Sequence, residues 1–473
     1  MVSMPWMRQG SPKGWRLTDM GVTQELCERI CATGFDDLTE DAKAAARRLV
    51  LDGLAVAVAG SKQEASPGVL AGHLQEMGGI EAASAIGFGF RTSPVNAAYI
   101  NGVSMHVLDF EPMWNPANHQ LSTTLPAALA LAEWRGLGGR EVLTALVKGI
   151  EMQGWVRQAS HQFEARQAKF HPPGQVGPMG GVVAGGHMLR LDVDALRNAL
   201  GIAASRAGSL LANAGTMTKS TNCGVAVSAG LDAAMLAARG FTANPDIFEA
   251  PQGYVDGLFD DRFVLDELLN YGPPFRVVEP GYAIKMFPSQ YGTHFAITAA
   301  LELHSKINDP TQIVSVEVVT PQMFYIDRPK PVTGLAGKFS WQYVTASGLL
   351  DGKVTMSTFE DKRRFAPDME DMLSRISVNM REDIPARFDQ MHVETTVSLK
   401  DGTSVTARCD GPRGKWGSPP IPAEDHLAKV RDCLAIRLSG ADAEEVVSLA
   451  AHVDDLAPDE LKRLMGLVAT TGN

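Results

Sequence analysis

Strand-forming patterns are confined to one part of this 473-residue chain, and helical patterns lie on both sides of that part. The β-branched, alternating segments are typical of strands. They are QIVSVEVVTP (312–321), VTMSTF (354–359), RISVNMR (375–381) and HVETTVSLK (392–400). Asp401-Gly402 then predicts a hairpin turn into the segment TSVTARC. The strands therefore belong to one inserted unit and not to the whole fold.

Because helical patterns resume after the strands, we predict a mostly α fold with a discontinuous main body. Residues 1–272 and 412–473 are expected to build one large all-helical domain from both chain ends. Residues 275–410 are expected to form a smaller, inserted α+β lid domain. Gly272-Pro273-Pro274 marks the first boundary, and the linker GPRGKWGSPPIP marks the second.

The stretch 101–133 places an acid and a histidine in an irregular loop between two helical patterns. Pro112 and Pro116 prevent a regular helix from continuing past Asp109. His119 then precedes Ser and Thr residues that can cap the next helix. Loops held between rigid helices often carry catalytic groups. The spacing matches no metal or nucleophile motif, so a structural His119 beside a solvated Asp109 is an equally good interpretation.

Two further polar segments suggest nucleotide-binding loops, but each lacks the glycine motif that such a loop requires. His171 precedes two prolines and a glycine-rich run, yet no strand comes before it and G-x-G-x-x-G is absent. Small residues at helical spacing predict instead a closely packed helix. Lys219 lies in a polar loop before a predicted helix at 225–239, and the second glycine of a phosphate loop is missing. On their own, these segments indicate a structural histidine and a surface lysine.

Composition excludes several classes of partner. The net charge of −11, from 43 basic and 54 acidic residues, disfavours binding to nucleic acid. No apolar run approaches the ~18 residues that a membrane span needs. The five cysteines are scattered and form no zinc set, so we expect reduced packing residues. The first 21 residues lack the apolar core of a secretory signal, and we expect a cytoplasmic protein.

Several segments resemble the MmgE/PrpD family, which includes 2-methylcitrate dehydratase, cis-aconitate decarboxylase and iminodisuccinate epimerase. L-D-F is followed by W-x-P-A-x-H and by a helix that reads L-P-A-A-L-A-L-A-E. Further similar segments follow in the same order, up to about residue 465. They are the H-P-P of His171, TMTKST with Lys219, GYAIKMFPSQYGTH with Lys285, and TPQMFYIDRPKP with Tyr325. The nearest likeness is to the animal-type cis-aconitate decarboxylases.

The resemblance implies a site between the two domains that holds a substrate with several carboxylates. The implied catalytic residues are His119, Asp109 and His171, and the implied substrate-binding residues are Lys219, Lys285 and Tyr325. Histidine suits proton transfer near neutral pH, and lysine suits charge-assisted bonds to carboxylates. Asp109 would orient a histidine or contact substrate. No H-E-x-x-H, C-x-x-C pair or phosphate loop is present, so we expect neither a metal nor another cofactor.

The chain departs from the family pattern at the expected substrate pocket. Similar decarboxylase-like sequences read D-F-D-D-T-W-H-P-A where this chain reads D-F-E-P-M-W-N-P-A. Met113 thus replaces a hydroxyl residue and Asn115 replaces a histidine. Gln290 stands where the family often has a histidine or another polar group. We therefore expect Met113 and Gln290 to face substrate in an altered, more apolar pocket.

The leading interpretation is a cofactor-independent lyase that acts on a di- or tricarboxylate by dehydration or decarboxylation. One alternative is an epimerase, which removes and returns a proton without losing a group. Another is a non-catalytic homologue that binds a metabolite, although the presence of His119, Lys219 and Lys285 together argues against it. The resemblance also implies a homodimer.

Overall fold

The structure is a computed structural model that describes residues 21–164, 169–307, 309–416, 418 and 420–472. The segment 1–20, where we expect no secretory signal, lies outside the described residues. Helices fill most of the chain before the strand-rich part. They are α1 (Val22–Ala32), α2 (Glu40–Gln63), α3 (Ala65–Met77), α4 (Pro94–His106), α5 (Leu125–Arg135), α6 (Gly139–Ala159), α7 (Pro172–Leu189), α8 (Val193–Ala204), α9 (Met217–Ala237) and α10 (Tyr254–Leu258). None of the described helices is long and apolar enough to cross a membrane.

Local chemistry explains where several of these helices begin and end. The Thr39 side chain accepts a hydrogen bond from the backbone N–H of Ala42 at 3.2 Å and so caps α2. Pro126 lies in the first turn of α5, where its missing N–H costs nothing. Gly136 ends α5 in the left-handed conformation, at φ 65°.

The glycine-rich run forms helix α7, as the sequence predicts, and packs closely on α9. A Cβ atom at Gly181 would lie 2.9 Å from the carbonyl oxygen of Val227. A Cβ atom at Gly230 would lie 2.3 Å from the carbonyl oxygen of Pro178. Only glycine permits this approach of two backbones, which holds the middle of α7 against the middle of α9.

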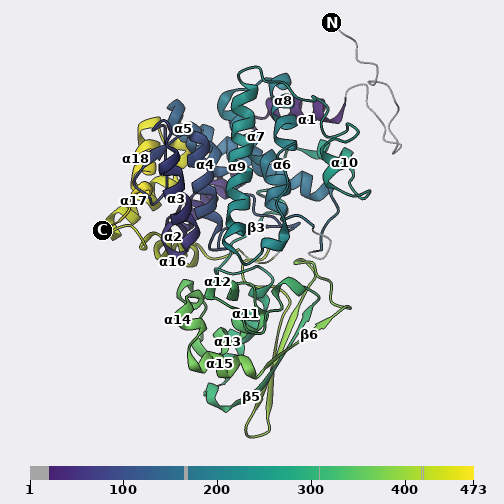
Figure 1. The fold of residues 1–473 in the computed structure, drawn as a ribbon, viewed down its shortest axis with the longest axis vertical. Helices are drawn as coiled ribbons and strands as arrows, with labels where there is room; N and C mark the ends of the chain where they lie inside the picture. The colour runs from purple at the N-terminus through teal and green to yellow at the C-terminus, as the bar shows by residue number, and fades with distance from the viewer. Residues whose placement is uncertain (1–20, 165–168, 308, 417, 419, 473) are drawn as a thin grey trace.

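The last helices return to the first ones, as Figure 1 shows. They are α16 (Ala423–Leu434), α17 (Gly440–Ala451) and α18 (Pro458–Ala469). α16 and α17 pack on α2, and one apolar core contains residues from both chain ends. A buried ion cluster reinforces this contact, because Asp52 lies 2.9 Å from His426 Nε2 and 2.8 Å from Lys429 Nζ.

The strand-rich part has a separate apolar core and lies below the helical body in Figure 1. Its sheet has the order β6-β5-β7-β8, with β5 parallel to β6 and antiparallel to β7. The strands are β5 (Ile313–Pro321), β6 (Ile376–Arg381), β7 (Val393–Leu399) and β8 (Ser404–Cys409). The accompanying helices are α11 (Thr293–Lys306), α12 (Gly334–Gly337), α13 (Trp341–Asp351), α14 (Asp361–Arg364) and α15 (Pro367–Ser374). α11 packs on β7 and β8, and α13 packs on β6.

The prediction of a mostly α fold with a smaller sheet-containing domain is confirmed. Two details were wrong. VTMSTF is not a strand, because Thr358 Oγ1 accepts a bond from Thr355 N at 3.0 Å and so favours a short 3₁₀ helix at Met356–Phe359. The helical part also contains a small ladder of β1 (Ala83–Ser84) with β2 (Arg91–Thr92), so it is not all-helical. The domain boundaries stay a prediction.

Candidate active site

The central loop (residues 107–124) connects α4 to α5, and Asp109 lies three residues after His106, the last residue of α4. The Asp109 N–H donates to the carbonyl of His106 at 2.8 Å, and the Asp109 backbone has a φ of 51°. Residues other than glycine rarely adopt this left-handed conformation. Such strain persists where the surrounding contacts impose it, and it is concentrated at functional sites. Two residues of the loop, Met113 and Trp114, form β3 and pair with β4 (Tyr282–Ala283), which joins the loop to the chain after the Gly-Pro-Pro segment.

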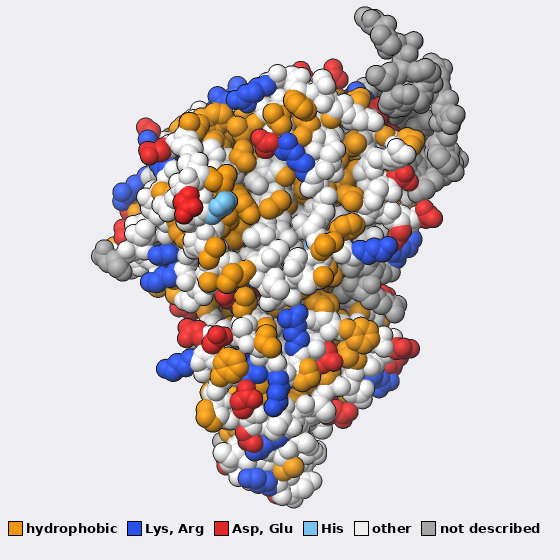
Figure 2. Space-filling view, viewed as in Figure 1, with side chains coloured by type: hydrophobic (Ala, Val, Ile, Leu, Met, Phe, Trp, Pro, Cys, Tyr) orange, Lys and Arg blue, Asp and Glu red, His pale blue; other side chains and the backbone are white. Residues whose placement is uncertain are grey.

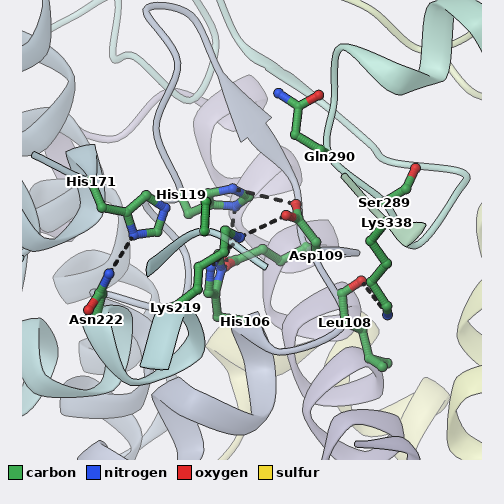
Figure 3. A network of polar contacts seen from close by, with 12 residues as sticks. His106, Leu108, Asp109, His119, His171, Lys219, Asn222, Ser289, Gln290 and Lys338 are labelled. Carbon is green, nitrogen blue, oxygen red and sulfur yellow. Dashed lines mark hydrogen bonds and ion pairs between the residues drawn. The ribbon is translucent and has the colours of Figure 1, made fainter. Parts of the chain in front are cut away.

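The Asp109 carboxylate is buried between two lysines from distant parts of the chain. Its Oδ2 accepts a bond from Lys219 Nζ at 2.7 Å (Figure 3). Its Oδ1 accepts a bond from Lys285 Nζ. Burial alone would raise the pKa of Asp109, but the charges of Lys219 and Lys285 outweigh it and hold that pKa well below its usual value. Asp109 is therefore an ionised counter-charge at neutral pH.

His106 lies between Glu111 and Lys219 and is held in one tautomer. Its Nδ1 is 2.8 Å from Glu111 Oε1, and its Nε2 is 2.9 Å from Lys219 Nζ. Because an ammonium group can only donate, Nε2 is the acceptor and Nδ1–H donates to Glu111. Burial and the charge of Lys219 lower the pKa of His106 to about 3. His106 is thus neutral and fixes the position of Lys219.

Glu111 anchors the start of α5 as well as His106. Its carboxylate accepts bonds from Ser122 N at 2.9 Å and from Ser122 Oγ at 2.7 Å. His119 Nδ1 lies 3.4 Å from Glu111 Oε1 and has no hydrogen-bond partner within the described residues. His119 Nε2 lies 3.7 Å from Asp109 Oδ1. Burial lowers the pKa of His119 despite the opposing effect of Glu111, so the ring is a neutral group available for proton transfer.

His171 supplies a second neutral imidazole on the opposite side of the site (Figure 3). It occupies the N-cap position of α7, and its Nδ1 lies 3.3 Å from Asn222 Nδ2. Because the amide NH₂ can only donate, Nδ1 accepts and the ring proton is on Nε2. Burial, together with the charge of Lys219, holds the pKa of His171 well below its usual value. The centroids of the His119 and His171 rings are 6.4 Å apart.

One cavity collects most of the predicted site residues. Those that line it are Asp109, Met113, His119, His171, Lys219, Gln290 and Tyr325. Gln290 Nε2 donates to the Tyr325 hydroxyl at 2.7 Å, so these two side chains form one wall. Phe163, Phe339 and Phe388 add apolar surface.

Two residues singled out from the sequence lie elsewhere. Lys285 is completely buried and bonded to Asp109, and it is not among the described residues that line the cavity. Asn115 does not line the cavity either, and its carbonyl accepts a bond from Arg276 at 3.0 Å. Of the three departures from the family pattern, only Met113 and Gln290 therefore reach the cavity.

The expected loop around Lys219 is helical. Helix α9 begins at Met217, so Lys219 lies in its first turn and not in a loop before 225. The hydroxyls of Ser220 and Thr221 bond backwards to the carbonyls of Met217 and Thr218, at 2.8 and 2.7 Å. These bonds satisfy the polar side chains within the helix, which the composition of the segment does not reveal.

Sequence reasoning missed His106 and Glu111. A signal was present, since HVLDFE sets three titratable residues among apolar ones, and buried charges need partners. The donor atoms of His106, Glu111 and Cys223 also lie within 4.8 Å of one another, as in a metal site. His106 and Glu111 are bonded to each other, however, and burial raises the pKa of the Cys223 thiol well above its usual value. This set fits a proton-holding network better, and the absence of a metal stays a prediction.

Comparison with known proteins places this geometry in a family. The MmgE/PrpD N-terminal domain model matches residues 24–265, and the MmgE/PrpD C-terminal domain model matches residues 287–455. The chain is similar to cis-aconitate decarboxylase of Mus musculus, with 29% identity over 92% of this chain and 91% of the relative. It is 31% identical to cis-aconitate decarboxylase of Homo sapiens over 77% and 78% of the two chains. It is 26% identical to 2-methylcitrate dehydratase of Cupriavidus necator over 67% and 68%. Two matched domain models that together cover most of the sequence show that the chain belongs to the MmgE/PrpD family.

Proposed function

We propose that this protein is a cofactor-independent lyase that removes water or CO₂ from a di- or tricarboxylate. The observation that carries the proposal is the pair of neutral histidines, His119 and His171, in one cavity with the lysine-bound Asp109. Relatives named cis-aconitate decarboxylase and 2-methylcitrate dehydratase support the reaction class. Both of those names describe a reaction next to a carboxylate.

Lys219 is the residue best placed to bind a substrate carboxylate. Its ammonium group donates to Asp109 and His106 and also lines the cavity, so one N–H remains for a ligand. Lys285 does not line the cavity, and we propose that it acts on substrate through the Asp109 carboxylate. Gln290, Tyr325 and Met113 would shape the wall that faces the rest of the substrate.

The two histidines would carry the protons. In dehydration, His119 takes a proton from the carbon next to a carboxylate, and the Nε2–H of His171 protonates the departing hydroxyl. In decarboxylation, the electron pair that remains on carbon after CO₂ leaves takes a proton from one of these histidines. Positioned acid–base catalysis of this kind contributes about 10²–10⁴-fold.

Turnover of the named substrates tests the proposal. The purified protein is incubated with cis-aconitate, with CO₂ release as the readout, and with 2-methylcitrate, with the absorbance of the new conjugated double bond as the readout. Activity that survives exhaustive dialysis against a chelator is expected. Binding of these carboxylates without turnover would instead identify a metabolite-binding protein.

The pH dependence of kcat/KM should report Lys285. Burial lowers the pKa of Lys285 to about 8, although Asp109 opposes this effect. Above that pH the lysine loses its charge, Asp109 loses one of its two cations, and we expect kcat/KM to fall. Below that pH Lys285 stays protonated, so the profile should be level towards neutral pH. In Lys285→Met this basic limb should be absent, and an unchanged limb in that variant would contradict the assignment.

We further propose a cytoplasmic homodimer with no nucleic-acid partner. The five cysteines are free thiols, which suits a reducing compartment. On the face drawn in Figure 2, basic and acidic side chains alternate without a broad basic area. The dimer rests on family likeness, and light scattering at micromolar concentration tests it, with a monomer as the contrary result.

A further inference from the structure

Arg157 is a buried arginine in the wall of the same cavity. It lies on α6 and is 2% exposed. Its Nη2 donates to the carbonyl of Gln162 at 2.7 Å, and its Nη1 lies 3.4 Å from Ser160 Oγ. Its Nε–H has no hydrogen-bond partner, and no carboxylate lies within ion-pair distance in the part of the chain that the structure describes.

The other buried cations around the site have a counter-charge. Lys219 and Lys285 bond to Asp109, and Lys338 lies 3.2 Å from Glu64. A buried charge without such a partner is costly to the folded protein. Burial lowers the pKa of Arg157 to about 10, so the group is still charged at neutral pH. Arg157 is therefore a buried cation in the cavity wall that forms no ion pair with a described carboxylate, although Glu164 also lines the cavity.

The position of Arg157 on α6 relates it to the central loop. Gln153 lies one turn earlier on α6, and residues four apart lie on the same face of a helix. The side-chain oxygen Oε1 of Gln153 accepts bonds from Asn118 Nδ2 at 3.2 Å and from Thr123 Oγ1 at 2.9 Å, both on the central loop. This face of α6 thus lies against the loop that carries His119, and Arg157 extends it by one turn. Nearby cavity walls include Phe163 and Phe388, whose apolar rings strengthen electrostatic attraction.

We infer that Arg157 binds a substrate carboxylate remote from the reacting carbon, while Lys219 binds another. This inference rests on the proposed function and names the substrate class more closely. A substrate with two carboxylates besides the reacting one fills both positions, so the site selects a tricarboxylate over a dicarboxylate. The planar guanidinium suits this role because it can offer two parallel N–H donors to one carboxylate.

Binding of three probes to Arg157 variants tests the inference. The probes are cis-aconitate and two dicarboxylates, glutaconate and itaconate, and titration calorimetry measures the affinities. Each dicarboxylate keeps the CH₂-carboxylate that decarboxylation removes and lacks one of the two carboxylates attached to the double bond. Arg157→Met should weaken cis-aconitate binding by ~10- to 100-fold and leave nearly unchanged the binding of the dicarboxylate that lacks the Arg157-bound carboxylate. The affinity of Arg157→Lys for cis-aconitate should lie between those of the wild type and Arg157→Met. Lysine keeps the positive charge but lacks the two parallel N–H donors of the guanidinium. KM for cis-aconitate should rise in the same order.

The controls separate a binding role from a structural one. Arg206→Met removes an exposed arginine paired with Asp232 and should change none of these affinities. If Arg157→Met and Arg157→Lys weaken the binding of all three probes equally, Arg157 is structural and the inference is overturned. If the wild type prefers cis-aconitate and both variants keep that preference, the inference about Arg157 is wrong while the proposed function still stands. If wild type neither binds nor converts any of the probes, the proposed function fails and the inference fails with it.

Discussion

Replacement of His119 by alanine is expected to lower kcat by about 10²–10⁴-fold, which is the usual contribution of a positioned acid or base. The ring lines the cavity, and its Nδ1 makes no hydrogen bond to the described protein. Its loss should therefore remove proton transfer while Lys219 still holds substrate. Steady-state kinetics and calorimetric titration of the variant measure the two effects separately.

His187→Ala is a matched control for that variant. His187 is also a histidine packed within the helical part, where it lies 3.3 Å from Lys148, but it does not line the cavity. The kcat of the His187→Ala variant should stay within a few-fold of the wild-type value. A His119→Ala variant with near wild-type kcat would remove the central loop from the chemistry.

Replacement of the two lysines by methionine should separate substrate binding from the positioning of Asp109. Lys219→Met removes the ammonium that lines the cavity, so KM should rise by ~10- to 100-fold, the effect of one charge-assisted bond to a carboxylate. Lys285→Met removes a buried cation that is hydrogen-bonded to Asp109. Removal of one partner from a buried ion pair costs up to ~3–5 kcal/mol, although Lys219 still compensates Asp109. Lys285→Met should thus lower kcat and thermal stability more than it raises KM.

Lys148→Met provides the control for loss of a buried lysine. Lys148 is 3% exposed, donates to the carbonyl of Thr33 at 2.8 Å and does not line the cavity. The Lys148→Met substitution should lower the thermal stability of the protein without changing KM. Similar KM increases in Lys148→Met and Lys219→Met, or wild-type kcat/KM in both site variants, would refute the roles assigned to Lys219 and Lys285.

The sequence by itself determined the features that depend on neighbouring residues. Thr39 and Pro126 mark helix starts through bonds within one turn, and the alternation in 392–400 places β7 because side chains point to opposite faces of a strand. The order of helical, strand-rich and helical segments was enough to predict the fold class. Motifs in family order were enough to indicate the family. They also nominate Asp109, His119, His171 and Lys219 as site residues, which stays a prediction.

Only the tertiary structure decided which charges are paired and which reach the cavity. Lys219 and Lys285 meet Asp109 across 110 and 176 residues of sequence, and no local pattern encodes that meeting. The contact of His106 with Lys219 and the buried contact of Lys285 with Asp109 are likewise visible only in the folded chain. Arg157 lacks an ion pair because the fold places no described carboxylate within ion-pair distance of it. Burial and charge pairing are properties of the assembled core, because desolvation and Coulomb energy depend on distances in space and not on separation along the chain.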